Sequence, residues 1–295
     1  MVTPKQVLLG ALLVMTAAFI LFWIRVAARH REERGGPTPV GTAIGFATNF
    51  FDTLGIGSFA TTTTMFRLWR LVPDQKIPGT LNVGHALPTV VQALIYITIV
   101  DVQFNTLALL ILAAVAGSWI GATIVAGMNR QKIQFGMGVA LLVAAVLMVM
   151  TALNRFPGGG EELGLHGAKL QVGIVVNFIL GALMTLGIGA YAPCMIMVSL
   201  LGMNPTAAFP IMMGSCAFLM PTASIQFIRK EKYDLRASLG LALGGMPAVV
   251  VAAYIVRSLP LAYVRWLVVV VVVYAALMLL RSAARERAAI GAAAA

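Results

Sequence analysis

Seven long apolar segments recur along the chain, each bounded by polar, charged or helix-ending residues. Each is close to the roughly 20 residues that an α-helix needs to cross the hydrocarbon core of a bilayer. The polar linkers between them are short, which leaves no room for a separate soluble domain. The pattern predicts an all-α, multi-pass membrane protein with transmembrane helices at about residues 5–26, 77–100, 104–128, 133–153, 207–228, 235–256 and 260–281.

Two further apolar elements, at about residues 41–71 and 168–203, are interrupted near the middle by Gly-Ile-Gly. Non-helical backbone cannot face lipid, because each unpaired N–H or C=O group costs several kcal/mol in hydrocarbon. Each interruption is therefore expected to be buried in protein or to line a watery cavity. The element that carries it either crosses the membrane as a broken helix or is re-entrant and leaves on the side from which it came.

The chain contains an internal duplication with an offset of 132 residues. The pentapeptide TLGIG occurs at residues 53–57 and again at 185–189, and the match continues in register without a gap. Duplications of this kind underlie many secondary transporters. The residues that coincide are Gly41 with Gly173, Phe46 with Phe178, Met65 with Met197, Leu68 with Leu200, Pro73 with Pro205 and Pro78 with Pro210.

Composition agrees with a membrane protein and argues against other classes. The 295 residues are 60% hydrophobic and 11% charged, which is far from the mix of a soluble domain. The net charge of +11 comes from short basic runs at the ends of apolar segments, so we expect no nucleic-acid partner. Cys194 and Cys216 lack the spacing of metal ligands, and no Walker pattern for ATP is present. We expect no metal and no cofactor.

The basic residues also predict the topology. If both Gly-interrupted elements are re-entrant, 16 of the 21 Lys and Arg residues lie in the cytoplasm and five lie outside. If both cross fully, the split is 13 to eight, so the positive-inside rule favours the re-entrant arrangement. Each half then has an odd number of crossings, and the halves are inverted repeats. The N-terminus is expected outside and the C-terminus in the cytoplasm, in the cell (inner) membrane.

The chain accordingly divides into four parts. Residues 1–40 hold an N-terminal transmembrane helix, whose apolar run is too long for a signal peptide, and a basic cytoplasmic linker. Residues 41–153 form the first membrane repeat, and residues 154–167 form a glycine-rich external linker. Residues 168–295 form the second repeat with a short basic cytoplasmic tail. Each repeat consists of one Gly-interrupted element followed by three transmembrane helices.

The two interruptions are the expected place for a ligand. The helix after each glycine pair offers its first free N–H groups and the positive end of its dipole, which together suit an anion. The alternative is that the glycines only let helices pack closely and that nearby polar side chains bond neighbouring helices. The repetition of the glycine pair in register favours a binding site over close packing alone. The predicted substrate-binding residues are Gly55, Gly57, Ser58, Thr61, Thr62, Asn82, His85, Gly187, Gly189, Ala190, Tyr191 and Ser215, with Thr89 and Gln92 as further candidates.

Two ionisable residues in the apolar segments are candidates for proton coupling. Asp52 is the only acid far inside such a stretch, and charged groups at membrane depth are costly enough to suggest a function. His85 is the second candidate, because histidine side chains ordinarily titrate near neutral pH. In the second half the equivalent residues are Met184 and Ala217, so the duplication does not support either role, and Asp52 could instead simply accept bonds from nearby N–H groups.

At these residues the chain resembles the TauE/SafE family of sulfite exporters and related anion permeases. The resemblance rests on TLGIGSFATTTT and TLGIGAYAPCMI, which occupy the places of that family's doubled GIGGG stretch, and it covers about residues 41–281. Ser58 replaces the third glycine, and Thr62 or its neighbours stand where the family has a proline. The resemblance implies a sulfur-containing or organic anion as substrate.

The resulting hypothesis is a secondary transporter, and an exporter in direction, of sulfite or an organosulfonate. The anion binds between two opposed broken-helix N-termini and moves by alternating access. The chain is not expected to be an enzyme, since clustered acids or histidines are missing, although a membrane-embedded enzyme and an anion channel are the alternatives. The expected partners are the small anionic substrate and the lipid bilayer.

Overall fold

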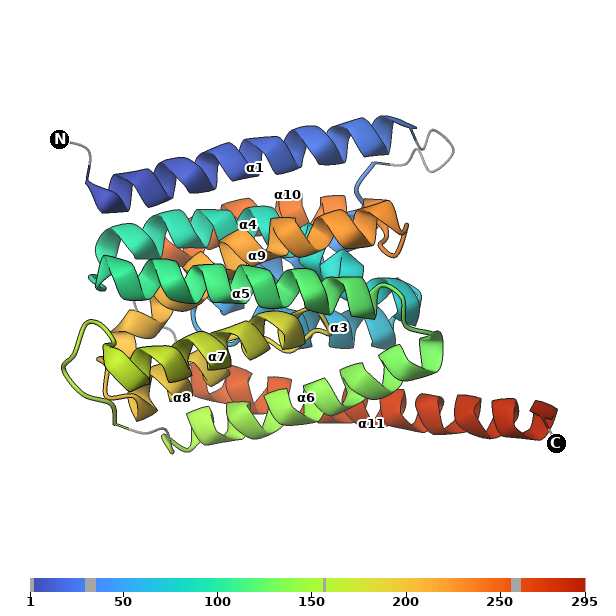
Figure 1. The fold of residues 1–295 in the computed structure, drawn as a ribbon. Coiled ribbons are helices and arrows are strands. Elements are labelled where there is room, and N and C mark those ends of the chain that lie inside the picture. Colours follow the sequence, from blue (N-terminus) through green and yellow to red (C-terminus); the bar gives the residue numbers. More distant parts are fainter. Residues whose placement is uncertain (1–2, 30–35, 156–157, 256–260, 295) are drawn as a thin grey trace.

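The structure, a computed structural model, describes residues 3–29, 36–155, 158–255 and 261–294 (Figure 1). In these ranges the regular elements are all helices, with no strand and one isolated β-bridge between Glu162 and Met203. The linker residues 30–35 and 156–157 and the predicted external Arg257 lie outside the described residues. The elements are α1 (Pro4–Arg29), α2 (Pro39–Thr53), α3 (Ser58–Leu68), η2 (Asp74–Lys76), α4 (Ile77–Ile99), α5 (Phe104–Val125), α6 (Arg130–Ala152), α7 (Gly167–Met184), α8 (Tyr191–Leu200), η3 (Pro205–Ala207), α9 (Ala208–Arg229), α10 (Leu235–Ile255) and α11 (Leu261–Ala294).

The helices confirm the predicted segments to within a few residues, except at the C-terminus. Among the described residues, seven helices are long and apolar enough to cross a membrane: α1, α4 with η2, α5, α6, α7, α9 with η3, and α10. The protein is therefore an all-helical, multi-pass membrane protein. The set also includes α7, the first part of the second Gly-interrupted element. The span predicted at 260–281 lies in α11, which continues as one helix through the basic tail.

Helices α4 and α9 form the centre of the bundle. They pack on each other and are the most buried of the seven candidate spans. Around them, α2 packs along α10, α7 packs along α5, and α6 packs along α11. Helix α1 lies along one side with most of its surface exposed (Figure 1).

Glycines allow two of these helix pairs to pack closely. A Cβ atom on Gly45 of α2 would lie 2.6 Å from the Leu241 Cα atom of α10, and one on Gly181 of α7 would lie 2.2 Å from the Ala114 carbonyl oxygen of α5. Neither pair could approach so closely with a larger residue at these positions. Small residues at helix contacts are the usual means of close packing in membranes.

One end of the bundle brings together the starts of α2, α4 and α10. The Asp234 backbone N–H donates a hydrogen bond to Thr80 Oγ1 at 2.9 Å, which joins the start of α10 to the start of α4. The Arg236 Nε group donates to the Gly36 carbonyl at 3.3 Å, just before α2 begins. Arg67 at the end of α3 bonds Asp74, which precedes α4. Four chain segments therefore meet at this end.

The opposite end joins the start of α5 to the segment before α7 and the segment after α8. The Gln103 N–H donates to the Leu163 carbonyl at 2.8 Å, and the Asn204 N–H donates to the Glu162 carbonyl at 2.8 Å. The residues before α5 and after α8 are thus held by the same short stretch of the linker that leads into α7.

Candidate functional site

Both predicted interruptions are real breaks in the helices. Helix α2 ends at Thr53 and α3 begins at Ser58, while α7 ends at Met184 and α8 begins at Tyr191. Gly55, Gly57 and Gly187 have φ angles of 90°, 88° and 102°, in the region that residues with a side chain rarely adopt. The backbone at each break therefore depends on glycine.

Two small cavities lie between the breaks. The first, of about 30 Å³, is lined by Asp52, Gly57, Ser58, Phe59, Thr89, Gln92, Met184, Gly189, Ala190, Met212, Met213, Cys216 and Met220. The second, of about 40 Å³, is lined by residues that include Gly55, Ala192 and Pro193, together with α6. Gly57 and Gly189 line both. Segments 132 residues apart in the sequence thus meet at one place inside the bundle. We call these two cavities together the central site.

The first break does not offer the free helix N-terminus that was predicted. The Asp52 side chain lies against it, and its Oδ1 atom accepts the Ser58 backbone N–H at 2.8 Å. The Gln92 Nε2 group donates to Asp52 Oδ2 and to Thr53 Oγ1, both at 3.0 Å. The expectation of an open anion-binding end on α3 is therefore wrong, because a carboxylate of the protein already occupies it. A carboxylate is favoured there for the same reason as a bound anion.

The second break differs at the equivalent position. Met184 takes the place of Asp52 there, and among the described residues no side chain accepts a hydrogen bond from the N–H groups at the start of α8. Pro193 has no N–H group, so Tyr191 and Ala192 supply the first backbone donors of this helix. The uncapped end of α8 and the capped end of α3 therefore face the central site with different chemistry.

The remaining walls of the central site are mostly apolar and rich in sulfur. Met212, Met213, Met220 and Cys216 of α9 line the first cavity together with Met184. Among its lining residues Asp52 is the only charged side chain, and none is basic. The Gln92 Oε1 atom is buried without a hydrogen-bond partner among the described residues. Methionine side chains are flexible and polarisable, so this wall can adapt to a ligand.

His85 lies beside the central site and does not line it. Its ring is fully buried, with Nε2 at 3.0 Å from Thr62 Oγ1 and Nδ1 at 3.1 Å from Asn49 Oδ1. The Asn49 Nδ2 group donates to the Gly45 carbonyl, so its Oδ1 atom must accept, and Nδ1 of the ring must carry a proton. In the neutral imidazole Nε2 then accepts from the Thr62 hydroxyl. This arrangement joins α2, α3 and α4 and gives His85 a structural role.

Other predicted residues also form hydrogen bonds outside the central site. Thr61 donates to the Gly57 and Ser58 carbonyls, and Asn82 donates to the Pro78 carbonyl. Of the predicted set, the structure brings Gly55, Gly57, Ser58, Gly189 and Ala190 to the central site, and it leaves out Thr61, Thr62, Asn82, His85, Gly187 and Ser215. The Tyr191 side chain lies outside the described part of the chain.

The lining residues that α9 supplies, Met212, Met213, Cys216 and Met220, were not predicted, nor were those of α6 such as Ala144 and Thr151. They look like ordinary membrane-helix residues in the sequence, so only the fold places them at the site. In the part of the chain that the structure describes, no three His, Cys, Asp or Glu side chains are grouped as metal ligands.

These features define a multi-pass membrane protein whose two broken helices meet at a small internal site. Comparison with protein families places the chain more narrowly, since residues 2–148 match the family described as Sulfite exporter TauE/SafE. The chain belongs to this family of membrane transport proteins. The matched residues cover α1 to most of α6, which is the first half of the chain. No curated protein and no solved structure matches the chain.

Proposed function

We propose that this protein is a secondary transporter of a small sulfur-containing anion, such as sulfite or an organosulfonate. The single observation that carries the proposal is that both helix breaks, one from each half of the chain, line the same central site. The membership of the TauE/SafE family supports the substrate class. The anion binds at the uncapped N-terminus of α8, where backbone N–H groups and the helix dipole favour negative charge.

In this proposal Asp52 couples anion binding to proton binding. Its carboxylate and the bound anion both face the small first cavity, which holds no basic group to offset two negative charges. At such close range and low polarity their repulsion is large. The anion therefore binds when Asp52 has taken up a proton, and one proton moves with each anion in the same direction. When the anion accumulates in the cytoplasm, its gradient makes the carrier an exporter.

The bonds at the ends of the bundle support re-entrant elements. The start of α2 lies against the start of α10, which is hydrogen-bonded to the start of α4. The end of α3 lies at the same end of the bundle, because Arg67 bonds Asp74 just before α4. At the other end, the hydrogen bond from the Asn204 N–H to the Glu162 carbonyl holds the end of α8 near the start of α7 in the same way. Figure 1 agrees, since α3 and α8 lie toward opposite ends of the bundle.

The pairing of helices supports inverted repeats. Helix α2 of the first half packs along α10 of the second, and their equivalents α7 and α5 pack on each other in the same manner. Helices α4 and α9, which are also equivalent, meet at the centre. Such reciprocal packing is expected of two halves related by a pseudo-two-fold axis. Alternating access then follows from rocking of the halves around the central site, with the N-terminus outside and the C-terminus in the cytoplasm.

The first test of the proposal is a ligand panel on the purified protein. Sulfite, thiosulfate, sulfoacetate, taurine and acetate are added in turn, and the unfolding temperature is measured for each. A ligand present at about 100 times its Kd stabilises the folded state by about 2.7 kcal/mol. We expect sulfite or a sulfonate to raise the unfolding temperature by several degrees and acetate to have little effect. Equal shifts for all five, or none, would remove the proposed substrate class.

A further inference from the structure

A separate and much larger cavity lies at the end of the bundle where α3 finishes. It has a volume of about 900 Å³ and is bounded by the end of α3, the segment before α4, the start of α6 and the C-terminal half of α11. It shares no lining residue with the central site. Four arginines line it: Arg67, Arg70, Arg130 and Arg285.

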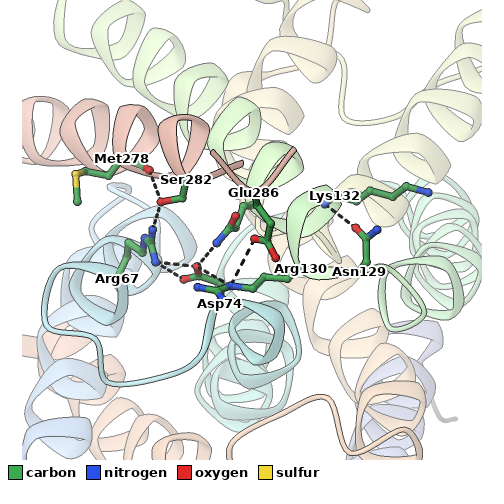
Figure 2. A network of polar contacts seen from close by, with 9 residues as sticks. Arg67, Asp74, Asn129, Arg130, Lys132, Met278, Ser282 and Glu286 are labelled. Carbon is green, nitrogen blue, oxygen red and sulfur yellow. Dashed lines mark hydrogen bonds and ion pairs between the residues drawn. The ribbon is translucent and has the colours of Figure 1, made fainter. Parts of the chain in front are cut away.

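Asp74 forms the buried floor of this cavity. It is only 5% exposed, and its oxygens accept bonds from Arg67 Nη1 at 2.8 and 2.7 Å and from Gln134 Nε2 at 2.7 Å. Arg67 also donates to Ser282 of α11, as Figure 2 shows. These bonds fix the Arg67 guanidinium and connect α3, α6 and α11 at one point.

Positive charge exceeds negative charge at this cavity. Arg130 lies 4.0 Å from Asp74 and 3.7 Å from Glu286, so the two carboxylates offset Arg67 and Arg130 (Figure 2). The side chains of Arg70 and Arg285 are exposed and make no hydrogen bond or ion pair with any residue that the structure describes. Two guanidinium groups are therefore available to an anionic ligand at the mouth of the cavity.

Apolar and aromatic side chains lie beside the arginines, and most of them are exposed, as expected at a membrane surface. Tyr274 and Met278 of α11 line the cavity, and Tyr274 is 53% exposed. Trp69 and Leu71, on either side of Arg70, are 57% and 40% exposed. Tryptophan next to basic residues is typical of the interface between hydrocarbon and lipid headgroups. The cavity thus has a basic side and a lipid-facing apolar side.

We propose that this cavity binds an anionic phospholipid, with its phosphate between Arg70 and Arg285 and its acyl chains along Tyr274 and Met278. Basic pockets between transmembrane helices bind anionic lipid headgroups in this way, and guanidinium groups suit phosphate oxygens. A small oxyanion would leave most of 900 Å³ unfilled and would not explain the apolar side. Since Arg70 follows α3 and Arg285 belongs to α11, the bound lipid joins these two helices.

Native mass spectrometry of lipid-depleted protein in neutral detergent tests this proposal. Dioleoyl phosphatidylglycerol and dioleoyl phosphatidylcholine are added separately, and the bound fractions are compared. We expect clear preference for phosphatidylglycerol in the wild-type protein. Each arginine at a membrane surface contributes about 1 kcal/mol to binding anionic lipid, so the double variant Arg70→Gln/Arg285→Gln is expected to bind it about 30-fold more weakly. Both arginines are exposed and unpaired, so their loss should leave the fold intact.

The matched control is Arg281→Gln/Arg287→Gln, which removes the same charge from exposed positions on α11 that do not line the cavity. We expect this variant to bind phosphatidylglycerol within twofold of wild type. Inorganic phosphate and glycerol phosphate are added as competitors to separate a lipid from a soluble anion. The proposal is overturned by equal binding of the two lipids, by equal loss in both double variants, or by full displacement of the lipid with millimolar phosphate.

Discussion

Replacing Gly189 with leucine is expected to stop transport. Gly189 lines both cavities of the central site, and a Cβ atom built there meets nothing within 4 Å, so the side chain enters the site without clashing with the backbone. Four added carbon atoms then fill cavities of about 30 and 40 Å³. Sulfite flux into proteoliposomes should fall at least about 30-fold, the equivalent of some 2 kcal/mol of lost binding.

The control for this substitution is Gly10→Leu. Gly10 lies on α1, outside both repeats, and a Cβ atom there also meets nothing within 4 Å. The two variants should unfold at similar temperatures, which separates loss of binding from loss of folding. Equal flux through both would show that the space between the breaks is not on the transport path.

Asp52→Asn is expected to separate anion movement from proton movement. The new amide oxygen can still accept the Ser58 N–H, and a flip of the Gln92 amide lets the unpaired Oε1 atom accept from the new NH₂ group. The fold should therefore survive, but the side chain no longer binds a proton. A fluorescent pH dye inside proteoliposomes should record one proton per anion for the wild type and only the protein-free background for the variant. A lower pH on the side from which sulfite enters should raise the rate of sulfite uptake by the wild type but not by the variant.

Two controls define the role of Asp52. Asp101→Asn removes a carboxylate whose side chain is 91% exposed, and this variant should behave as wild type at each pH. Because sulfite itself is protonated equally in both measurements, any difference between the two variants comes from Asp52. His85→Gln alters the other predicted coupling residue, which the structure places outside the central site. Proton movement should persist in the folded fraction of that variant. If Asp52→Asn still carries protons with the anion, the coupling proposal fails.

The helices could be predicted from the sequence because a bilayer imposes a strict length and an apolar surface on every span. The predicted segment at 77–100 and the observed helix α4 at Ile77–Ile99 illustrate the agreement. The prolines inside the apolar segments were not predicted to end a helix, and Pro88, Pro221 and Pro247 do lie inside helices. The glycine breaks at Gly57 and Gly189 were also predictable, since their register in the duplication was visible.

The chemistry of the site was harder to predict because it depends on which polar group reaches which. Asp52 lies six residues before Ser58, and only the turn between α2 and α3 brings its carboxylate to the Ser58 N–H. His85 was predicted to bind substrate or to couple protons, but Asn49 and Thr62 are hydrogen-bonded to its two ring nitrogens. Each of these bonds joins residues on different helices, and hydrophobic pattern alone does not specify such pairs.

In the proposed mechanism a small sulfur-containing anion occupies one site that faces the two sides of the membrane in turn. Counterflow tests it most directly: proteoliposomes loaded with excess unlabelled sulfite are diluted into a trace of radiolabelled sulfite. A carrier exchanges labelled for unlabelled anion, so we expect transient accumulation of label above its equilibrium level, with an initial rate that saturates as external sulfite rises. A channel, or a protein that does not carry sulfite, gives no such accumulation, and that result would contradict the proposed mechanism.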